Sequence, residues 1–217
     1  MNMLNINFVH WSREHNAISD IANQVVTSDI IILLIKDDAI EDFFQQHISS
    51  LLDNDKIVVH FSNCIYLDDV VGCAPLCVFA NKLYDCSFYE NIIFAIDHGK
   101  YSLQDIFPKM PNNYFVIPSS YKAYYHAWCC MAGNFTCLLW KKCIDNLSQL
   151  DPLLQDGIKQ YMQSVFLSLQ QDPAQAMTGP LVRNDTDTID LHLAALRNCD
   201  EKELYKTFVS YYRKLHK

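Results

Sequence analysis

The stretch 119–147 contains no proline, and its length limits what the chain can fold into more than any other feature. Ser119 or Ser120 can cap the start of a helix there. Between residues 123 and 140 the stretch is apolar on nearly every face, which is typical of a buried helix. The sequence therefore predicts one long, buried helix around which the rest of the chain is arranged.

Strongly polar side chains interrupt this helix at His126, Asn134 and Thr136. At about 100° per residue, His126 and Asn134 lie roughly 80° apart, two turns along one broad side. Two hydrogen-bonding groups on one side of a buried helix either satisfy a core network or line a site. Both interpretations stay open at this point.

Composition excludes several kinds of partner. The formal net charge is −8, whereas phosphate backbones and anionic membranes bind clustered Lys and Arg. No apolar run reaches the roughly 18 residues that a membrane span needs, and no signal peptide pattern is visible. We therefore expect a soluble, cytoplasmic protein without a nucleic-acid or membrane partner.

The chain has nine cysteines, an odd number, and free thiols in a reducing compartment are the expected state. Cys64, Cys73, Cys77 and Cys86 lie close together in the sequence and allow a zinc or thiol protein as a third hypothesis. No CxxC pair occurs, so this pattern favours core cysteines over metal ligands, and we expect no metal.

The first half alternates strands and helices, which predicts a parallel sheet with right-handed crossovers. The predicted strands are 6–11, 29–35, 56–62, 77–80, 91–96 and 114–117; the predicted helices are 18–26, 37–52 and 102–107. After residue 118 the pattern is helical alone, with further helices at 151–171, 186–198 and 200–215. The sequence thus predicts an α/β Rossmann-like domain, 1–118, followed by an all-α domain, 119–217.

Two segments resemble the signature stretches of a known family: YHAWCCMAGNF (125–135) and AMTGPLVRNDTDTIDLHLAAL (176–196). They are similar to those of Rossmann-like oxidoreductases with a helical C-terminal domain, within the 6-phosphogluconate dehydrogenase and ketopantoate reductase superfamily. The matching positions are Tyr125, His126, Asn134, Thr178, Gly179, Pro180, Arg183, Asp185, Thr188 and His192, with Asn184 in place of the usual glycine.

This resemblance implies an NADP-dependent reductase of a small 2-keto acid, ketopantoate in pantothenate synthesis being the example. His126 is implied as the general acid and Asn134 as the group that orients the substrate. The cofactor would lie across the carboxyl ends of the strands. Ser12 and Arg13 would hold its 2′-phosphate, and Ile35, Lys36 and Ser62, at or directly after the ends of the next two predicted strands, would line it.

Thr178 and Arg183 are implied as substrate-binding residues, with Arg183 as a carboxylate clamp. Other interpretations stay open for each of these residues. His126 can be a core histidine, Asn134 can join two helices, and Arg183 can pair with Asp185. Asp185 followed by Thr188 is typical of a helix cap. A homodimer through the apolar helical domain is the expected assembly.

The glycine-rich turn of this family is absent from the sequence: no G-x-G-x-x-G occurs among its five glycines. The first strand that should precede that turn is also absent, so we expect an N-terminally truncated Rossmann-like domain. The second hypothesis is therefore a non-catalytic, cofactor-deficient, dimeric relative of the same fold. The retained His126, Asn134 and Arg183 favour the reductase.

Overall fold

The computed structural model describes residues 6–53, 55–79, 81, 83–97 and 99–216. The chain separates into two compact units, Met1–Cys137 and Leu138–Lys217. The division falls inside the long helix, while the last strand ends at Val116, close to residue 118 where the sequence changes from strands to helices.

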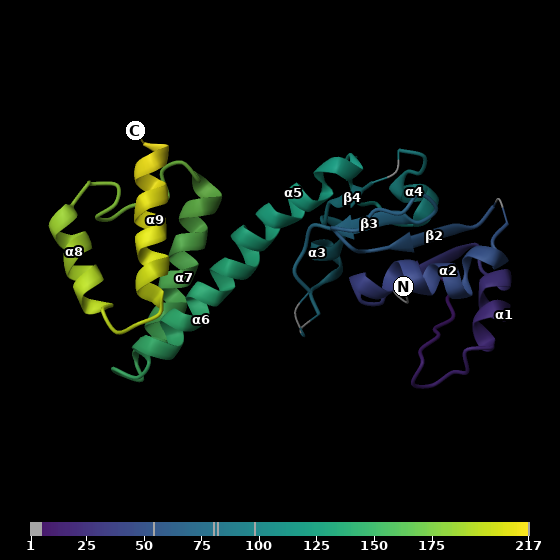
Figure 1. The fold of residues 1–217 in the computed structure, drawn as a ribbon, viewed down its shortest axis with the longest axis horizontal. Coiled ribbons are helices and arrows are strands. Elements are labelled where there is room, and N and C mark those ends of the chain that lie inside the picture. The colour runs from purple at the N-terminus through teal and green to yellow at the C-terminus, as the bar shows by residue number, and fades with distance from the viewer. Residues whose placement is uncertain (1–5, 54, 80, 82, 98, 217) are drawn as a thin grey trace. The chain divides into compact units, whose positions relative to one another are not determined.

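The first unit contains a five-stranded, mainly parallel sheet with helices beside it (Figure 1). Its strands are β1 (Ile30–Leu33), β2 (Ile57–His60), β3 (Val71–Pro75), β4 (Phe94–Ile96) and β5 (Tyr114–Val116). Its helical segments before residue 118 are α1 (Asp20–Thr27), η2 (Asp37–Ala39), α2 (Ile40–His47), η3 (Ser49–Leu51), α3 (Cys86–Glu90) and α4 (Leu103–Ile106). The predicted Rossmann-like α/β class is confirmed.

The sheet order is β1-β2-β3-β4-β5, and every neighbouring pair is parallel except β3 with β4. The predicted parallel pairing therefore holds for the strands at 29–35 and 56–62, and the sheet departs from it at the junction of β3 with β4. Leu33 lies opposite His60, His60 opposite Gly72, and Asp97 follows Ile96 beside Gly72. The carboxyl ends of β1, β2 and β4 thus meet the amino end of β3 in one row across the sheet.

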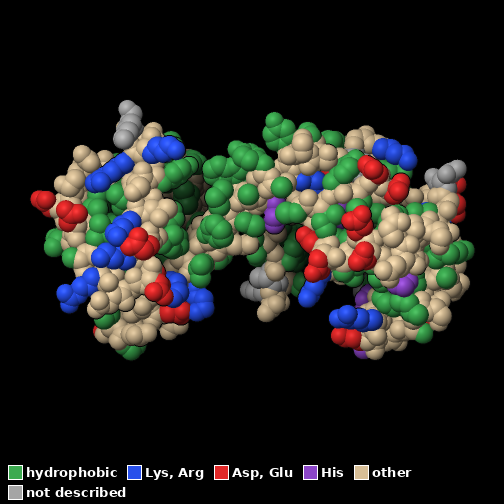
Figure 2. All heavy atoms as spheres, in the orientation of Figure 1, with side chains coloured by type: hydrophobic (Ala, Val, Ile, Leu, Met, Phe, Trp, Pro, Cys, Tyr) green, Lys and Arg blue, Asp and Glu red, His purple; other side chains and the backbone are tan. Residues whose placement is uncertain are grey.

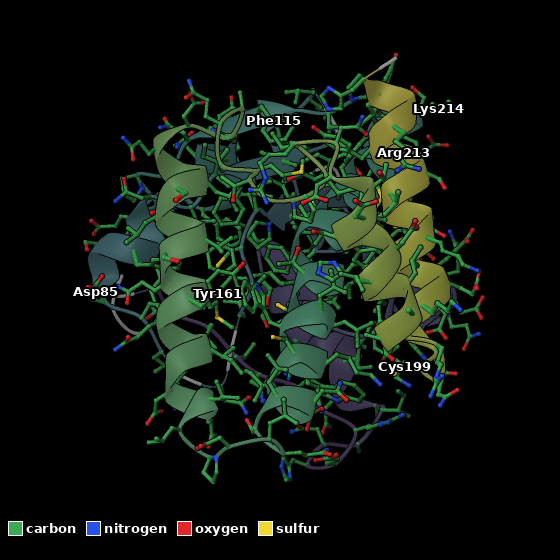
Figure 3. All side chains as sticks on the ribbon, turned by 90° about the vertical axis from the view of Figure 1, so that its left-hand side faces the viewer. Asp85, Phe115, Tyr161, Cys199, Arg213 and Lys214 are labelled. Atoms are coloured by element: carbon green, nitrogen blue, oxygen red, sulfur yellow. The ribbon has the colours of Figure 1, made fainter. Side chains whose placement is uncertain are left out.

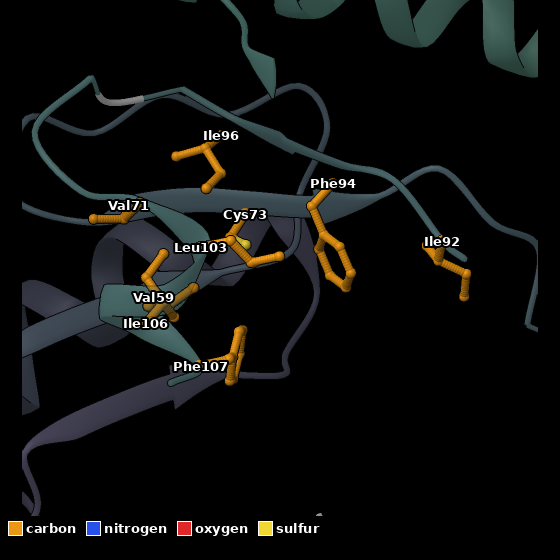
Figure 4. Packing of buried hydrophobic residues seen from close by; sticks show 9 residues of the cluster. All are labelled: Val59, Val71, Cys73, Ile92, Phe94, Ile96, Leu103, Ile106 and Phe107. Atoms are coloured by element: carbon orange, nitrogen blue, oxygen red, sulfur yellow. The ribbon is translucent and has the colours of Figure 1, made fainter. Parts of the chain in front are cut away.

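Helices cover both faces of the sheet because side chains alternate along its strands. On one face, Ile30, Ile32 and Val59 pack with the core cluster that includes Leu103 and Ile106 of α4. Figure 4 shows this cluster, whose buried members are Val59, Val71, Cys73, Ile92, Phe94, Ile96, Leu103, Ile106 and Phe107. The first turn of α4 is stabilised by a capping box between Ser102 and Asp105.

The other face carries a second cluster, built from α1 and α2. Ile40, Phe44 and Ile48 recur every four residues and form the buried stripe of α2. They pack with Leu33 of β1 and Val58 of β2. Strand β1 therefore contributes side chains to both clusters, although it lies at an edge of the described sheet and Leu34 and Ile35 after it are exposed.

Two predicted strands are wrong. Residues 6–11 form no strand: Trp11 instead stacks near Phe43 of α2, with ring centroids 5.9 Å apart, and its indole N–H donates to the carbonyl of Ala17. Residues 77–79 are also irregular, and Ala80 lies outside the described residues. The strand of that region is β3, five residues earlier, where small Gly72, Cys73 and Ala74 fit between β2 and β4.

The long helix is present as α5 (Ser119–Cys130), a π-helical segment η4 (Met131–Phe135) and α6 (Thr136–Leu147). Pro118 occupies the N-cap position, so the predicted serine cap does not form. The prediction of burial is wrong as well. Lys122 is the buried residue of α5, while Tyr124 and Trp128 are at least half exposed. Figure 2 shows hydrophobic side chains along this helix.

The second unit is entirely helical where it is described. It comprises most of α6, then α7 (Leu154–Gln171), α8 (Thr186–Ala195) and α9 (Glu201–Leu215), close to the predicted ranges. In Figure 3, Tyr161 lies on α7, Cys199 in the turn before α9, and Arg213 and Lys214 near the end of α9. None of the described helices combines the length and the apolar character needed to cross a membrane.

Gly72 provides the first test of this packing. A Cβ atom there would meet the Asp97 carboxylate and lie 2.6 Å from Nζ of Lys122. We expect Gly72→Ala to lower the free energy of unfolding by about 3 kcal/mol, because overpacking would displace a buried ion pair.

Gly157 lies inside α7, and a Cβ atom added there would have no neighbour within 4 Å. Gly157→Ala is the matched control and should stabilise the chain by up to about 1 kcal/mol. Urea unfolding of both variants is the measurement, and equal stability would contradict the packing described.

Candidate functional site

A buried ion pair joins the start of α5 to the row where the strands meet. Lys122 Nζ donates to Asp97 Oδ2 at 2.6 Å, and the two side chains are 4% and 0% exposed. The same ammonium also donates to the carbonyl of Ile65. Asp97 Oδ1 accepts from the backbone N–H of Gly72 at 2.8 Å. The pair therefore holds β3, β4, the β2–β3 connection and α5 together.

Four polar side chains follow one another at intervals of four residues along the helix: Lys122, His126, Cys130 and Asn134. Residues four apart lie on one face of an α-helix, with a drift of about 40° at each step. The π-helical segment Met131–Phe135 contains Asn134, and its wider turn reduces that drift at the last step. Because Lys122 is fixed to Asp97, this stripe continues from the row of strand ends.

The stripe is connected through the Cys130 sulfur. His126 Nε2 lies 3.4 Å from Cys130 Sγ, and Asn134 Nδ2 donates to the same sulfur at 3.8 Å. The prediction that His126 and Asn134 share one side of the helix is confirmed. His126 Nδ1 is shielded from water and has no hydrogen-bond partner. A buried polar atom without a partner costs free energy and is often retained for function.

The carboxyl ends of β1 and β2 are joined by a second polar cluster. Ser62, which is 5% exposed, donates from Oγ to Asp37 Oδ2 at 2.6 Å. The backbone N–H groups of Cys64 and Ile65 donate to Ser62 Oγ, each at 3.2 Å. Ile35 and Lys36, directly before Asp37, are exposed. The structure thus brings together three predicted cofactor-binding residues: Ile35, Lys36 and Ser62.

The two clusters lie near each other. The pKa of the Cys64 thiol is raised, first by burial and then by electrostatic interaction with Asp37 and Cys130, while Lys122 acts in the opposite direction. Electrostatic influence of this kind places Cys64 within range of groups from both clusters. On the same helix, burial and the neighbouring Cys129 raise the pKa of Tyr125 to about 12, so its hydroxyl is neutral near pH 7.

Ser12 and Arg13 lie in a turn near the start of the described chain, before α1. The carbonyl of Ser12 accepts from the N–H groups of His15 and Asn16, and its own N–H donates to Asn16 Oδ1. The Ser12 hydroxyl is buried without a hydrogen-bond partner, and Arg13 is exposed. Their role in binding a 2′-phosphate stays a prediction.

Thr178 and Arg183 belong to the second unit, where both are exposed. Each directly precedes a residue with positive φ: Gly179, with a φ of 96°, follows Thr178, and Asn184, with a φ of 52°, follows Arg183. Asparagine tolerates this left-handed conformation better than most residues, which explains how it replaces the glycine usual at that position. Their substrate-binding roles stay predictions.

Asp185 caps α8 as predicted. Its carboxylate accepts from the backbone N–H of Thr188 at 3.1 Å and from the Thr188 hydroxyl at 2.8 Å. These hydrogen bonds hold the pKa of Asp185 below its usual value. His192, one turn later, contacts the Tyr205 hydroxyl of α9 at 2.8 Å, which joins the last two helices.

The zinc hypothesis receives no support. Among the described residues, no three or more His, Cys, Asp or Glu side chains come together as a set of metal ligands. All nine cysteines are free thiols. Cys73 is buried within the sheet, where burial and then the Asp97 carboxylate raise its pKa to about 12.

Sequence reasoning missed two participants in this region, Lys122 and Asp97. Lys122 precedes the polar side of the helix by a turn, and Asp97 stands outside every motif of the sequence. The useful signal is an acidic residue directly after the apolar strand 94–96. A charged residue at such a place is often buried with a partner, and a lysine at the start of a later helix, here α5, can supply one.

Sheet, flanking helices and polar strand ends define a Rossmann-like α/β fold with an added helical unit. The chain belongs to the family described as a domain of unknown function, DUF2520, whose model matches residues 92–212, more than half of the sequence. No curated protein matches the sequence.

Three solved structures share the fold. A proposed NADP oxidoreductase from Bacteroides fragilis is 20% identical, with a TM-score of 0.70, over 86% of this chain and 76% of that one. A protein from Thermotoga maritima is 23% identical, with a TM-score of 0.65, over 85% and 76%. Pyrroline carboxylate reductase from Plasmodium falciparum, with NADP bound, is 12% identical, with a TM-score of 0.53, over 88% and 77%.

Removal of the Lys122 ammonium tests the role of the ion pair. We expect Lys122→Met to lower the free energy of unfolding by about 3–5 kcal/mol, because it leaves the Asp97 carboxylate buried without its cation. Lys141→Met is the matched control, since Lys141 pairs with Asp145 on an exposed helix face. Its effect should stay within about 0.5 kcal/mol. Chemical denaturation compares the two, and similar losses would show that the Lys122 pair has no special role.

Proposed function

We propose that this chain is a nicotinamide-dependent reductase that reduces a small 2-keto acid with NADPH, ketopantoate being the example. The observation that carries the proposal is the polar stripe His126–Cys130–Asn134, tied through Lys122 to the ends of β1, β2 and β4. Ligands of open α/β sheets bind at the carboxyl ends of strands. The names of two structural neighbours, an NADP oxidoreductase and a reductase with NADP bound, agree with this class.

The residues at this edge fit a dinucleotide in part. Exposed Lys36 and Arg13 supply cations for phosphate groups, and Ile35 supplies an apolar surface. Ser62 and its partner Asp37 shape the end of β2. The bound cofactor would supply a hydride to the carbonyl carbon. The role of this chain would be to bind it, exclude water and deliver a proton.

His126 is the proposed proton donor. If Cys130 donates its thiol proton to Nε2, the ring carries its own proton on Nδ1, the nitrogen without a partner. That N–H can then donate to the carbonyl oxygen as the oxygen becomes negative. Asn134 would orient a substrate hydroxyl or carboxylate. Thr178 and Arg183 are proposed as substrate-binding residues on the family resemblance alone.

The alternative is a non-catalytic, cofactor-deficient relative of the same fold. The observation that favours it is the absence of G-x-G-x-x-G from the sequence, because that turn seats the pyrophosphate on a helix N-terminus in related folds. The two functions differ in a single measurable property, the affinity for NADPH.

A titration with NADPH, followed by nicotinamide fluorescence, distinguishes them. The reductase should bind at micromolar to millimolar concentration and oxidise NADPH when ketopantoate or another small 2-keto acid is added. No binding at millimolar NADPH would rule out the reductase for this polypeptide and favour the alternative.

The proton donor is tested by His126→Gln, which keeps the side chain polar but removes the titrating ring. We expect kcat to fall by about 10² to 10⁴ because general acid catalysis is lost, with NADPH affinity nearly unchanged. His216→Gln, at the end of the chain beyond α9, is the matched control and should retain full turnover. Unchanged turnover in His126→Gln would remove His126 from the mechanism.

We also propose that the helical unit forms a homodimer. Its described residues bury few apolar side chains, namely Ile158, Ile189 and Val209. Large apolar side chains remain exposed, including Leu150, Leu153 and Tyr161. An apolar surface of this extent favours a permanent partner, and a second copy is always available. Analytical ultracentrifugation at micromolar concentration should give twice the 25.1 kDa chain mass, and a monomer would contradict the proposal.

A further inference from the structure

We propose that Cys130 is a nucleophilic thiol, activated by His126, that reacts covalently with small α,β-unsaturated carbonyl compounds. The geometry that carries the proposal is the 3.4 Å contact between Cys130 Sγ and His126 Nε2. A thiol within hydrogen-bond reach of a base is the general arrangement of an activated nucleophile. The inference does not depend on binding of any cofactor.

The two partners of the sulfur are placed to assist its reaction. The imidazole of His126 can accept the thiol proton as the sulfur forms its new bond. The amide of Asn134 donates to the same sulfur at 3.8 Å, and a donor of this kind stabilises negative charge on its acceptor. Both contacts come from the helix that carries Cys130, one turn before it and one turn after it.

A π-helical segment directly after Cys130 supports the proposal independently. The helix changes from α to π immediately after Cys130, over Met131–Phe135. Such segments are rare and occur frequently at functional sites. Here the π-helical turn contains Asn134 and so determines where its amide lies relative to the sulfur. Cys130 itself is partly exposed, which a reaction with a small molecule requires.

The other cysteines provide internal comparisons. Cys73 is fully buried, and its pKa is raised to about 12, so it should not react in the folded protein. Cys137 is exposed on α6 of the same long helix, seven residues after Cys130. Among the hydrogen bonds of the described residues, none joins Cys137 to an imidazole. Exposure alone would make Cys137 the faster of the two thiols on this helix.

The reaction conserves atoms and charge. The Cys130 sulfur forms a bond to the β-carbon of the unsaturated carbonyl compound, and the C=C π pair moves toward the carbonyl group. The thiol proton, held by His126, then passes to the α-carbon. With iodoacetamide, a C–S bond forms, the C–I bond breaks, iodide leaves, and His126 releases the proton to water. No oxidant or reductant is needed in either case.

The test is competitive alkylation of the full-length protein with limiting iodoacetamide at pH 7, with each cysteine quantified by peptide mass spectrometry. We expect Cys130 to react about tenfold faster than Cys137, because an imidazole within reach of the sulfur can accept the thiol proton during the attack. In His126→Gln the Cys130 rate should fall to that of Cys137 or below, while the Cys137 rate stays constant.

Cys73 reports whether a variant remains folded, because it becomes reactive only on unfolding. A Cys130 rate no greater than that of Cys137 in the folded wild type would overturn the proposal. So would an unchanged Cys130 rate in folded His126→Gln. If that variant unfolds, Asn134→Leu serves in its place and should slow Cys130 alone. A small enone such as methyl vinyl ketone should then show the same order of rates, and preferential addition at Cys137 would also overturn the proposal.

Discussion

The buried ion pair between Lys122 and Asp97 is the interaction on which the candidate site depends. Both side chains are almost completely withdrawn from water, and two backbone groups, the N–H of Gly72 and the carbonyl of Ile65, complete their hydrogen bonding. Buried charges are tolerated only when they are paired and hydrogen-bonded in this way. Because each partner comes from a different part of the chain, the pair fixes the start of the long helix against the sheet. Gly72 is required there for space, not for backbone freedom.

The arrangement of the candidate site follows from that attachment through helix periodicity. Once Lys122 is fixed, His126 and Cys130 follow at one and two turns along the same face. The π-helical turn then keeps Asn134 close to the Cys130 sulfur. A polar stripe thus extends from the row of strand ends, where Ser62 and Asp37 already join β1 to β2. Chemistry and cofactor contacts would meet along this line.

The sequence predicted the parts of the fold that depend on local interactions. The apolar runs of β1 and β2, the α4 helix after Ser102 and the Asp185–Thr188 cap were all found as expected, because short-range patterns determine them. The wrong predictions involve long-range partners. Residues 6–11 alternate like a strand but pair with no other, and Trp11 packs on α2 instead.

Burial of the long helix was the largest error, because apolar composition shows what a helix can bury but not what covers it. For the site, the sequence placed His126 and Asn134 on one side of the helix, and the family resemblance implied Ile35, Lys36 and Ser62 as cofactor-binding residues. It did not reveal Cys130 as their connection or Lys122 as the anchor. A cysteine in an apolar run is indistinguishable from a core residue until its neighbours are known.

Amide hydrogen exchange with and without saturating NADPH tests the central claim most directly, that a nicotinamide cofactor binds where the strand ends meet the polar stripe. The account predicts slower exchange in residues 35–40 and 61–66 and along 122–134, with α9 unchanged. Binding that protects other segments, or leaves these three unchanged, would contradict it.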